Sequence, residues 1–209
     1  MQVKIPLINK ILTILLWNYN TPGIPDELFE RNEEVPITKE DVRSIVISKL
    51  RLKNNSSAID VGCGSGSITV ELCLQARSGK IYGIDFNEKA IELTKINLKK
   101  FGVNAELVLA KAQDVLPSLP EVDSIIIGGT GGNVDKVIEL CIGKLKKGGR
   151  LVIDTILIET TYKALNLIDN ARLDEVDVTQ VTVAKAKKVT SGTMLLARNP
   201  VLLISATKP

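Results

Sequence analysis

Short apolar runs alternate with helical segments along most of the chain, and this alternation predicts the fold class. The runs are rich in β-branched residues and cover Ala58–Val61, Lys80–Ile84, Ala105–Leu109, Asp123–Ile127 and Arg150–Thr155. Apolar positions at helical spacing predict helices over 67–77, 87–101 and 133–146. We expect Gly102 and the pair Gly148–Gly149 to end the last two helices. Strands that are apolar on both faces and separated by helices are typical of a parallel sheet covered on both sides.

The pattern changes after a further helix predicted near 159–171. One long run contains Val176 and Val183, and another covers Val201–Ser205, with no helix of useful length between them. Two such runs predict an antiparallel pair at the end of the sheet. We therefore expect an α/β, Rossmann-like fold whose seven-stranded sheet is mostly parallel, with an antiparallel C-terminal strand and helices on both faces.

The first 22 residues are predicted to form a helical extension, and residues 23–209 a single domain. Ile8, Ile11, Leu12 and Leu15 lie on one face of an amphipathic helix, but the apolar stretch is too short and interrupted for a signal peptide or a membrane span. We expect this helix to pack on the body or on a neighbouring subunit; a helix lying on a membrane surface is the alternative. Thr21–Pro25 breaks it, and Thr38–Asp41 resembles a capping box that opens the next helix.

The composition says little about the fold, but it limits the ligands and the catalytic groups that the protein can use. The 209 residues carry 27 basic and 24 acidic side chains, a mild excess that does not demand nucleic acid. The three cysteines show neither metal-ligand nor disulfide spacing, which predicts a reducing, cytoplasmic compartment and no metal site. The chain has no histidine, so the commonest general base is missing.

A glycine loop follows the first apolar strand. It is the segment Asp60-Val61-Gly62-Cys63-Gly64-Ser65-Gly66, and a predicted helix follows it directly. In a dinucleotide-binding fingerprint the third glycine would stand where this chain has Ser67. The spacing D-x-G-x-G-x-G instead resembles the first motif of the S-adenosylmethionine (SAM) dependent methyltransferases. An acid before the glycines suits the cationic groups of that cofactor.

Asp85 ends the next predicted strand, one βα unit downstream. An acid at this place can accept hydrogen bonds from both ribose hydroxyls of a nucleoside. The alternative is that Asp85 only caps the helix that starts near Asn87. The order of strand, glycine loop and acid favours the ribose.

More specific segments resemble one family. They are Pro36–Arg43, Gly128–Gly132, Ile158–Thr160, Gly192–Met194 and Arg198–Val201. Together they resemble the cobalt-precorrin carbon-15 methyltransferases (decarboxylating) of cobalamin biosynthesis. The resemblance covers residues 23–207 and leaves 1–22 as an addition.

The resemblance implies a SAM cofactor, a tetrapyrrole substrate and a homotetramer that needs neither nucleic acid nor membrane. Such an enzyme methylates carbon-15 of cobalt-precorrin-6B and removes the carboxyl group of the ring C acetate. The implied cofactor residues are Thr38, Asp60, Gly62, Cys63, Gly64, Ser65, Gly66, Asp85 at the ribose and Ala112 at the adenine. Lys111 departs from the family, which usually has an acid there, so the expected adenine contact at this position is one through the backbone of Ala112.

The candidate substrate residues are Gly128, Gly129, Thr130, Lys187 and Arg198. The glycines leave room for a bulky ligand and the two cations suit its carboxylates; the alternatives are a plain strand-to-helix turn at Gly128–Gly132 and a solvated edge at Lys187. A reduced tetrapyrrole supplies its own carbon nucleophile and can take up the electrons released on decarboxylation, which agrees with a chain that lacks histidine. Glu159 and Arg198 are candidates for binding or protonating the substrate, or else they pair with other side chains. A tRNA adenosine or protein carboxyl methyltransferase of the same fold remains an alternative, as does a SAM-binding protein without activity.

Overall fold

The protein is described from a computed structural model that covers residues 17–209. Its main sheet has seven strands in the spatial order β3-β2-β1-β4-β5-β9-β6. They are β1 (Ala58–Val61), β2 (Ile81–Asp85), β3 (Glu106–Leu109), β4 (Val122–Ile127), β5 (Leu145–Thr155), β6 (Asp174–Val181) and β9 (Val201–Thr207). Strands β1 to β5 are parallel, and β9 runs antiparallel to both β5 and β6. The predicted mostly parallel sheet with an antiparallel C-terminal strand is confirmed.

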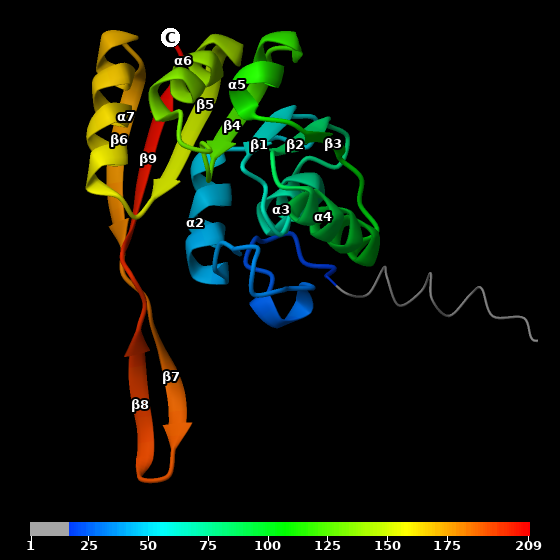
Figure 1. Cartoon of the computed structure of the whole chain (residues 1–209), viewed down its shortest axis with the longest axis vertical. Helices are drawn as coiled ribbons and strands as arrows, with labels where there is room; N and C mark the ends of the chain where they lie inside the picture. The colour runs from blue at the N-terminus through cyan, green and yellow to red at the C-terminus, as the bar shows by residue number, and fades with distance from the viewer. Residues whose placement is uncertain (1–16) are drawn as a thin grey trace, which may run out of the picture.

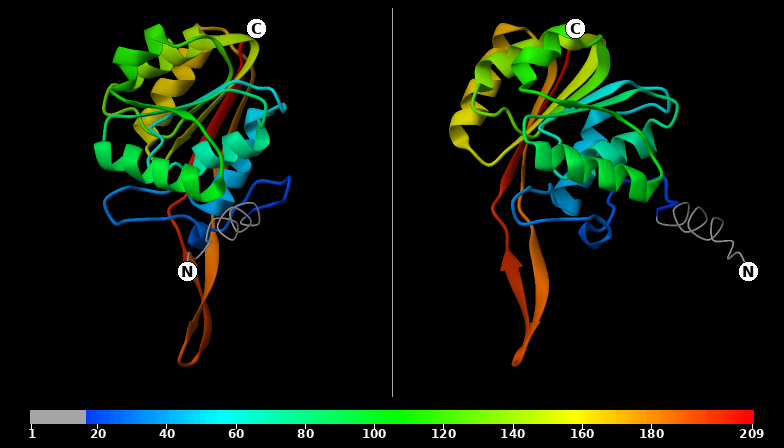
Figure 2. Two further views of the ribbon diagram at one scale, coloured as in Figure 1. Left: turned by 90° about the vertical axis from the view of Figure 1, so that its right-hand side faces the viewer. Right: turned by 45° about the vertical axis from the view of Figure 1, so that its right-hand side comes forward.

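Helices cover both faces of this sheet, as Figures 1 and 2 show. One face packs on α2 (Glu40–Leu50), α3 (Ser67–Gln75) and α4 (Glu88–Phe101); the other packs on α5 (Ala112–Val115), α6 (Val134–Lys144) and α7 (Ile158–Asn170). Two short 3-10 helices, Asp26–Leu28 and Leu116–Ser118, lie in the connections. Consecutive residues of a strand point to opposite faces of the sheet. Ile126 therefore packs on the face covered by α2, α3 and α4, and Ile127 packs on the face covered by α5, α6 and α7.

Two predicted helix boundaries were wrong, each for a local reason. Helix α2 begins at Glu40 with Lys39 at the cap, and Thr38 does not cap it. The cap comes from Asp26 instead: Glu40 N donates to Asp26 Oδ1 at 3.0 Å, and Asp26 N donates to Glu40 Oε2 at 3.3 Å. Gly102 does end α4 in the left-handed conformation, but Gly148 and Gly149 lie inside β5 rather than after a helix.

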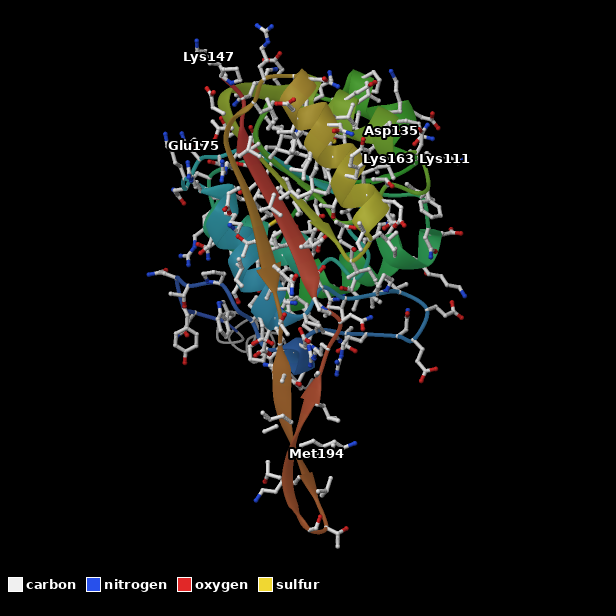
Figure 3. All side chains as sticks on the ribbon, turned by 90° about the vertical axis from the view of Figure 1, so that its left-hand side faces the viewer. Lys111, Asp135, Lys147, Lys163, Glu175 and Met194 are labelled. Atoms are coloured by element: carbon white, nitrogen blue, oxygen red, sulfur yellow. The ribbon has the colours of Figure 1, made fainter. Side chains whose placement is uncertain are left out.

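A two-stranded arm leaves the body between β6 and β9. Strands β7 (Ala184–Val189) and β8 (Gly192–Ala197) pair only with each other among the described residues. Figures 1 and 2 show the arm extending away from the sheet, and Figure 3 labels Met194 on it. The sequence predicted neither strand, because almost all of their residues are exposed and neither strand has the buried face that produces a strand pattern.

The predicted helix near residues 1–20 lies almost wholly outside the described residues. Trp17 is the first described residue, and its indole N–H donates to the carbonyl of Thr21 at 3.3 Å. Over residues 17–209, no helix is long and apolar enough to cross a membrane.

Candidate functional site

The glycine loop lies between two cavities at the carboxyl edge of the parallel strands. The first has a volume of about 250 Å³ and the second of about 220 Å³. Pro36, Gly62 and Gly64 line both of them. This edge, where the strands feed into loops, is where open α/β sheets bind their ligands.

The loop brings the ends of β1 and β4 into contact. Gly62, Gly64 and Gly66 have φ angles of 77°, 54° and 76°, a left-handed conformation that favours glycine. A Cβ atom on Gly62 would lie 2.7 Å from the backbone nitrogen of Gly129. Any side chain at Gly62 would therefore separate the two strand ends and fill the space beside both cavities.

Asp85 links the loop to the first cavity. Its Oδ2 atom accepts a hydrogen bond from Gly64 N at 3.0 Å, and Oδ1 accepts one from Asn87 N at 2.9 Å. Helix α4 is capped by Asn87, whose side chain accepts from Lys89 N at 3.0 Å. The capping alternative for Asp85 is therefore wrong. Its half-buried carboxylate lines the cavity and has lone pairs free for hydroxyl groups.

The far end of the first cavity has an aromatic wall. Phe86 lines it with its ring largely exposed, beside Lys111, Ala112 and Gln113. A flat heterocycle could stack on the ring of Phe86 while its polar edge meets the backbone around Ala112. The sequence analysis overlooked Phe86 and Gln113; each directly follows a residue that it named.

A buried arginine holds the segment that covers both cavities. Arg43 on α2 is fully buried, and its Nε donates to Glu71 Oε1 at 2.7 Å. Its other nitrogens donate to Asp26 Oδ1 at 3.2 Å and to the carbonyls of Ile24 and Thr38. These contacts position the chain from residue 24 to 38, whose last part lines both cavities.

The second cavity contains an acid that the sequence analysis missed. It is Asp154, the tenth residue of β5, which lines the cavity together with Thr38, Lys39 and Gly128. A Cβ atom on Gly128 would lie 3.3 Å from Asp154 Oδ1. The sequence hint was an acid directly after the apolar stretch Leu151–Ile153.

Comparison with known proteins assigns the family. The model of the precorrin methyltransferase domain matches residues 27–208. The chain belongs to this family. A probable cobalt-precorrin-6B C(15)-methyltransferase (decarboxylating) of Saccharolobus solfataricus is 47% identical to it, over 92% of this chain and 99% of that protein.

Two solved structures resemble this precorrin methyltransferase domain along most of its length. A precorrin-8W decarboxylase from Methanobacterium thermoautotrophicum superposes with a TM-score of 0.82 at 35% identity, covering 88% of this chain and 98% of the other. A precorrin-6Y C5,15-methyltransferase from Geobacter metallireducens gives a TM-score of 0.83 at 34% identity, covering 90% and 98%. The Rossmann-like fold predicted from the sequence is confirmed.

Two carboxyl groups, those of the buried Asp60 and the half-buried Asp154, have raised pKa values in this methyltransferase domain. Burial raises the pKa of Asp154 to about 6, against a hydrogen bond from the Thr38 side chain. Burial also raises the pKa of Asp60 to about 7, against the Thr69 hydroxyl that donates to it at 2.6 Å. The negative charges of Asp154 and Asp85 add to the shift of Asp60. Burial likewise raises the pKa of the Cys63 thiol, so this loop cysteine stays neutral.

The structure separates the remaining predicted site residues into three groups. Gly129 and Thr130 line the first cavity, whereas Gly128, Cys63, Ser65 and Thr38 line the second. Asp60 is buried behind the loop, and Gly66 caps α3. Glu159, Lys187 and Arg198 form the third group, which lines neither cavity and lies away from the loop. Glu159 is exposed on the first turn of α7, Lys187 lies on the arm, and a guanidinium nitrogen of Arg198 lies 4.0 Å from Asp26 Oδ2. The lysines that do line the cavities are Lys39 and Lys111.

Proposed function

We propose that this chain uses SAM to methylate carbon-15 of cobalt-precorrin-6B and to decarboxylate the ring C acetate, giving cobalt-precorrin-7. The main support for this proposal is the 47% identity, along nearly the whole chain, to a relative named for this activity. The glycine loop and Asp85 support it, because they combine a backbone cradle with a carboxylate for two hydroxyls. The tRNA and protein carboxyl methyltransferase alternatives have no similar support within the family match.

The two cavities suit the two ends of the cofactor. We place the adenosine in the first cavity, with its ribose at Asp85 and its base between Phe86 and the backbone of Ala112. The methionine part then crosses Gly62 and Gly64 into the second cavity, beside Ser65 and Thr38. Ser65 Oγ is buried and has no hydrogen-bond partner in the described chain, so it can serve the amino-acid part. When bound, SAM supplies an electrophilic methyl group.

Asp60 supports the cofactor from behind the loop in this arrangement. Its carboxyl group accepts from Thr69 and does not line either cavity. Gly66 acts in the same indirect way, since it starts α3. Cys63 lines the second cavity, and its thiol lies 3.7 Å from the hydroxyl of Thr94 and so also holds the loop. We therefore propose that these three residues shape the loop.

Apolar and basic side chains around the cavities suit a flat macrocycle that carries several carboxylates. Ile156 lines the second cavity and is 60% exposed, and Ile158, two residues later at the start of α7, is 77% exposed. Lys39 and Lys111 add positive charge at the two cavities. Gly128, Gly129 and Thr130 lie between these groups and remain proposed substrate neighbours, as do Lys187 and Arg198 in the assembled protein.

We propose a homotetramer in which the arm makes contacts between subunits. Met194 and Leu195 are 45% and 69% exposed, and Val189 and Leu196 are also exposed large apolar residues on the arm. An isolated two-stranded hairpin is marginally stable in water, so the arm gains stability when another copy covers it. Lys187, on the same arm, would then approach a neighbouring subunit. The three free cysteines are buried, and we propose a cytoplasmic location for the assembly.

Incubation with SAM and cobalt-precorrin-6B tests the proposed reaction. We expect a product that has gained one methyl group and lost one molecule of carbon dioxide, and mass spectrometry reads both changes at once. Methylation without decarboxylation would contradict the two-step assignment. No reaction with the tetrapyrrole, combined with normal SAM binding in a calorimetric titration, would favour a protein that binds SAM without turning it over.

A further inference from the structure

Asp154 occupies a gap that two glycines leave open at the end of the sheet. Val61 pairs with Ile127, and Ile127 pairs with Ile153. One residue further along, Gly62, Gly128 and Asp154 therefore form a row across three neighbouring strands. Because the first two have no side chain, the Asp154 carboxyl group opens into the second cavity.

The other neighbours of Asp154 leave its carboxyl group without a counter-ion. On the far side β9 presents the apolar Leu203, which is paired with Asp154 in the sheet. The segment before α2 contributes the Thr38 side chain, which lines the same cavity and lowers the pKa of Asp154 against the effect of burial. Lys39 lines the same cavity, but no ion pair joins it or any other described cation to Asp154. Asp60 on β1 is a further acid on this side, since the charge of Asp154 contributes to its raised pKa, and the Cys63 thiol lines the same cavity.

These surroundings favour a carboxyl group that takes and gives up a proton. Burial raises its pKa to about 6, so both forms of Asp154 are populated near neutral pH. Glu159, which the sequence suggested for this role, is exposed and lines neither cavity. Among the acids that line the two cavities, Asp154 lies on the opposite side of the glycine loop from the ribose-binding Asp85.

The proposed reaction needs such a group, because its two halves exchange one proton. Replacing C–H by C–CH₃ releases the proton of that carbon and returns its electron pair to the ring system. Loss of CO₂ breaks a C–C bond, and the carbon left behind must form a new C–H bond. The proton released in one half equals the proton consumed in the other, so no further acid, base or redox partner is required.

We propose that Asp154 is the catalytic residue that carries this proton. Protonated Asp154 donates to the carbon that loses CO₂, where the electron pair of the broken C–C bond forms the C–H bond. The Asp154 carboxylate then accepts the proton from the carbon that has been methylated. If decarboxylation comes first, Asp154 begins and ends the cycle protonated. If methylation comes first, it begins and ends the cycle as the carboxylate. This assignment rests on the proposed function.

Asp154→Asn tests the assignment with little change of shape. We expect SAM affinity within threefold of the wild type by calorimetry, and formation of the methylated, decarboxylated product reduced by more than a hundredfold. Asp154→Glu should recover part of that loss. Asp135→Asn is the matched control, because Asp135 is an exposed acid on α6 that pairs with Lys163 at 2.9 Å (Figure 3). It should leave both measurements unchanged.

A titration of the protein without cofactor gives an independent measurement. With ¹³C-labelled aspartate, NMR should show a carboxyl resonance that titrates near pH 6 and is missing from Asp154→Asn. In Asp154→Asn, product formation should no longer change with pH around pH 6, where the wild-type profile changes. Product formation by Asp154→Asn within fivefold of the wild type, with an unchanged pH profile, would overturn the proposal. So would a loss of SAM affinity large enough to explain the loss of product, because Asp154 would then be a cofactor ligand.

Failure of the proposed function gives a different result. In that case the wild-type protein itself forms no product from the tetrapyrrole, and the proton-transfer role falls with it. If the wild type is active, the comparison of Asp154→Asn with Asp154→Glu and Asp135→Asn decides the role of Asp154 alone.

Discussion

The carboxylate of Asp85 accepts a hydrogen bond from the backbone nitrogen of Gly64, at 3.0 Å, across two neighbouring strand ends. A single side chain therefore fixes the glycine loop and offers its remaining lone pairs to the first cavity. Gly64 lies in the left-handed conformation with φ of 54°, so its N–H needs a defined partner to hold the loop in place. Loop geometry and ligand binding are coupled through this one contact.

Asp85→Ala should weaken SAM binding strongly. Two ribose hydroxyls lose a charged acceptor and Gly64 N loses its partner, which costs about 2–3 kcal/mol, or roughly 30- to 150-fold in affinity. Calorimetric titration measures the change. Asp85→Asn keeps one oxygen for Gly64 N, so its SAM affinity should lie between that of the wild type and that of Asp85→Ala. Unchanged affinity in a folded Asp85→Ala protein would remove this residue from the site.

Gly62→Ala should damage the loop although it adds only one methyl group. Its φ of 77° costs an alanine about 1–2 kcal/mol, and the new Cβ would lie 2.7 Å from Gly129 N. We expect SAM binding to be lost in calorimetry. Gly143→Ala is the matched control: nothing lies within 4 Å of a Cβ at that position on α6, so stability should rise by up to about 1 kcal/mol. Normal SAM binding by Gly62→Ala would mean that the loop tolerates a wider β1–β4 spacing.

Arg43→Met should lower the free energy of unfolding and make the segment from residue 24 to 38, which covers the cavities, less well fixed. It leaves Glu71, which is 1% exposed, without its charged partner, a change that costs about 3–5 kcal/mol. Denaturant unfolding measures the loss, and SAM affinity should fall in the protein that remains folded. Lys163→Ala removes only an exposed pair with Asp135 (Figure 3) and should change stability by less than about 1 kcal/mol. Equal effects of both substitutions would contradict this account.

The parts of the site that lie on consecutive βα units could be predicted from the sequence. The glycine loop after β1 and Asp85 at the end of β2 are neighbours because the two strands pair in register, Val61 with Ile84. Strand pattern and residue order are enough to place them together. The same holds for Ala112, which follows β3 and reaches the same cavity.

Other features depend on contacts between distant segments, which no local pattern reports. Thr38 resembled a helix cap, but Asp26 supplies the cap, and Thr38 lines the second cavity together with Asp154, which lies more than a hundred residues away. Asp154 itself becomes accessible only because glycines occupy the two neighbouring strands. The arm was missed for another reason: its strands pair only with each other among the described residues, so they lack the buried face that gives other strands their pattern.

Leu195→Glu should reduce the size of the assembly without affecting the cofactor site. Leu195 is 69% exposed on the arm, which extends away from the sheet (Figure 1), and it lines neither cavity. Burying a new charge between subunits is unfavourable, so the assembly should dissociate. Light scattering measures the size, and calorimetry should show unchanged SAM affinity. Thr193→Glu, beside it on the same strand, tests whether any charge on the arm has the same effect. An unchanged particle size with Leu195→Glu would exclude this part of the arm from the interface.

The cofactor-free protein should lose stability as pH rises from about 4 to about 7. Asp60 has a pKa of about 7 in the folded protein against an ordinary value of 3.8, and Asp154 shifts in the same direction. The folded state therefore binds more protons than the unfolded state in this interval, and stability decreases with increasing pH. The pKa of Glu175 is lowered by the Thr207 hydroxyl and Arg51, and that of Asp177 by Lys49, so these two groups change stability at pH values below this range.

Denaturant unfolding at pH 5 and at pH 8 measures this dependence. Asp60→Asn removes the larger of the two shifts and keeps an oxygen to accept from the Thr69 hydroxyl, so the difference between the two pH values should shrink. Asp135→Asn again serves as the exposed control and should leave the difference unchanged. A wild-type protein that is more stable at pH 8 than at pH 5 would show that Asp60 and Asp154 are both ionised in the folded state, with a compensating partner for each.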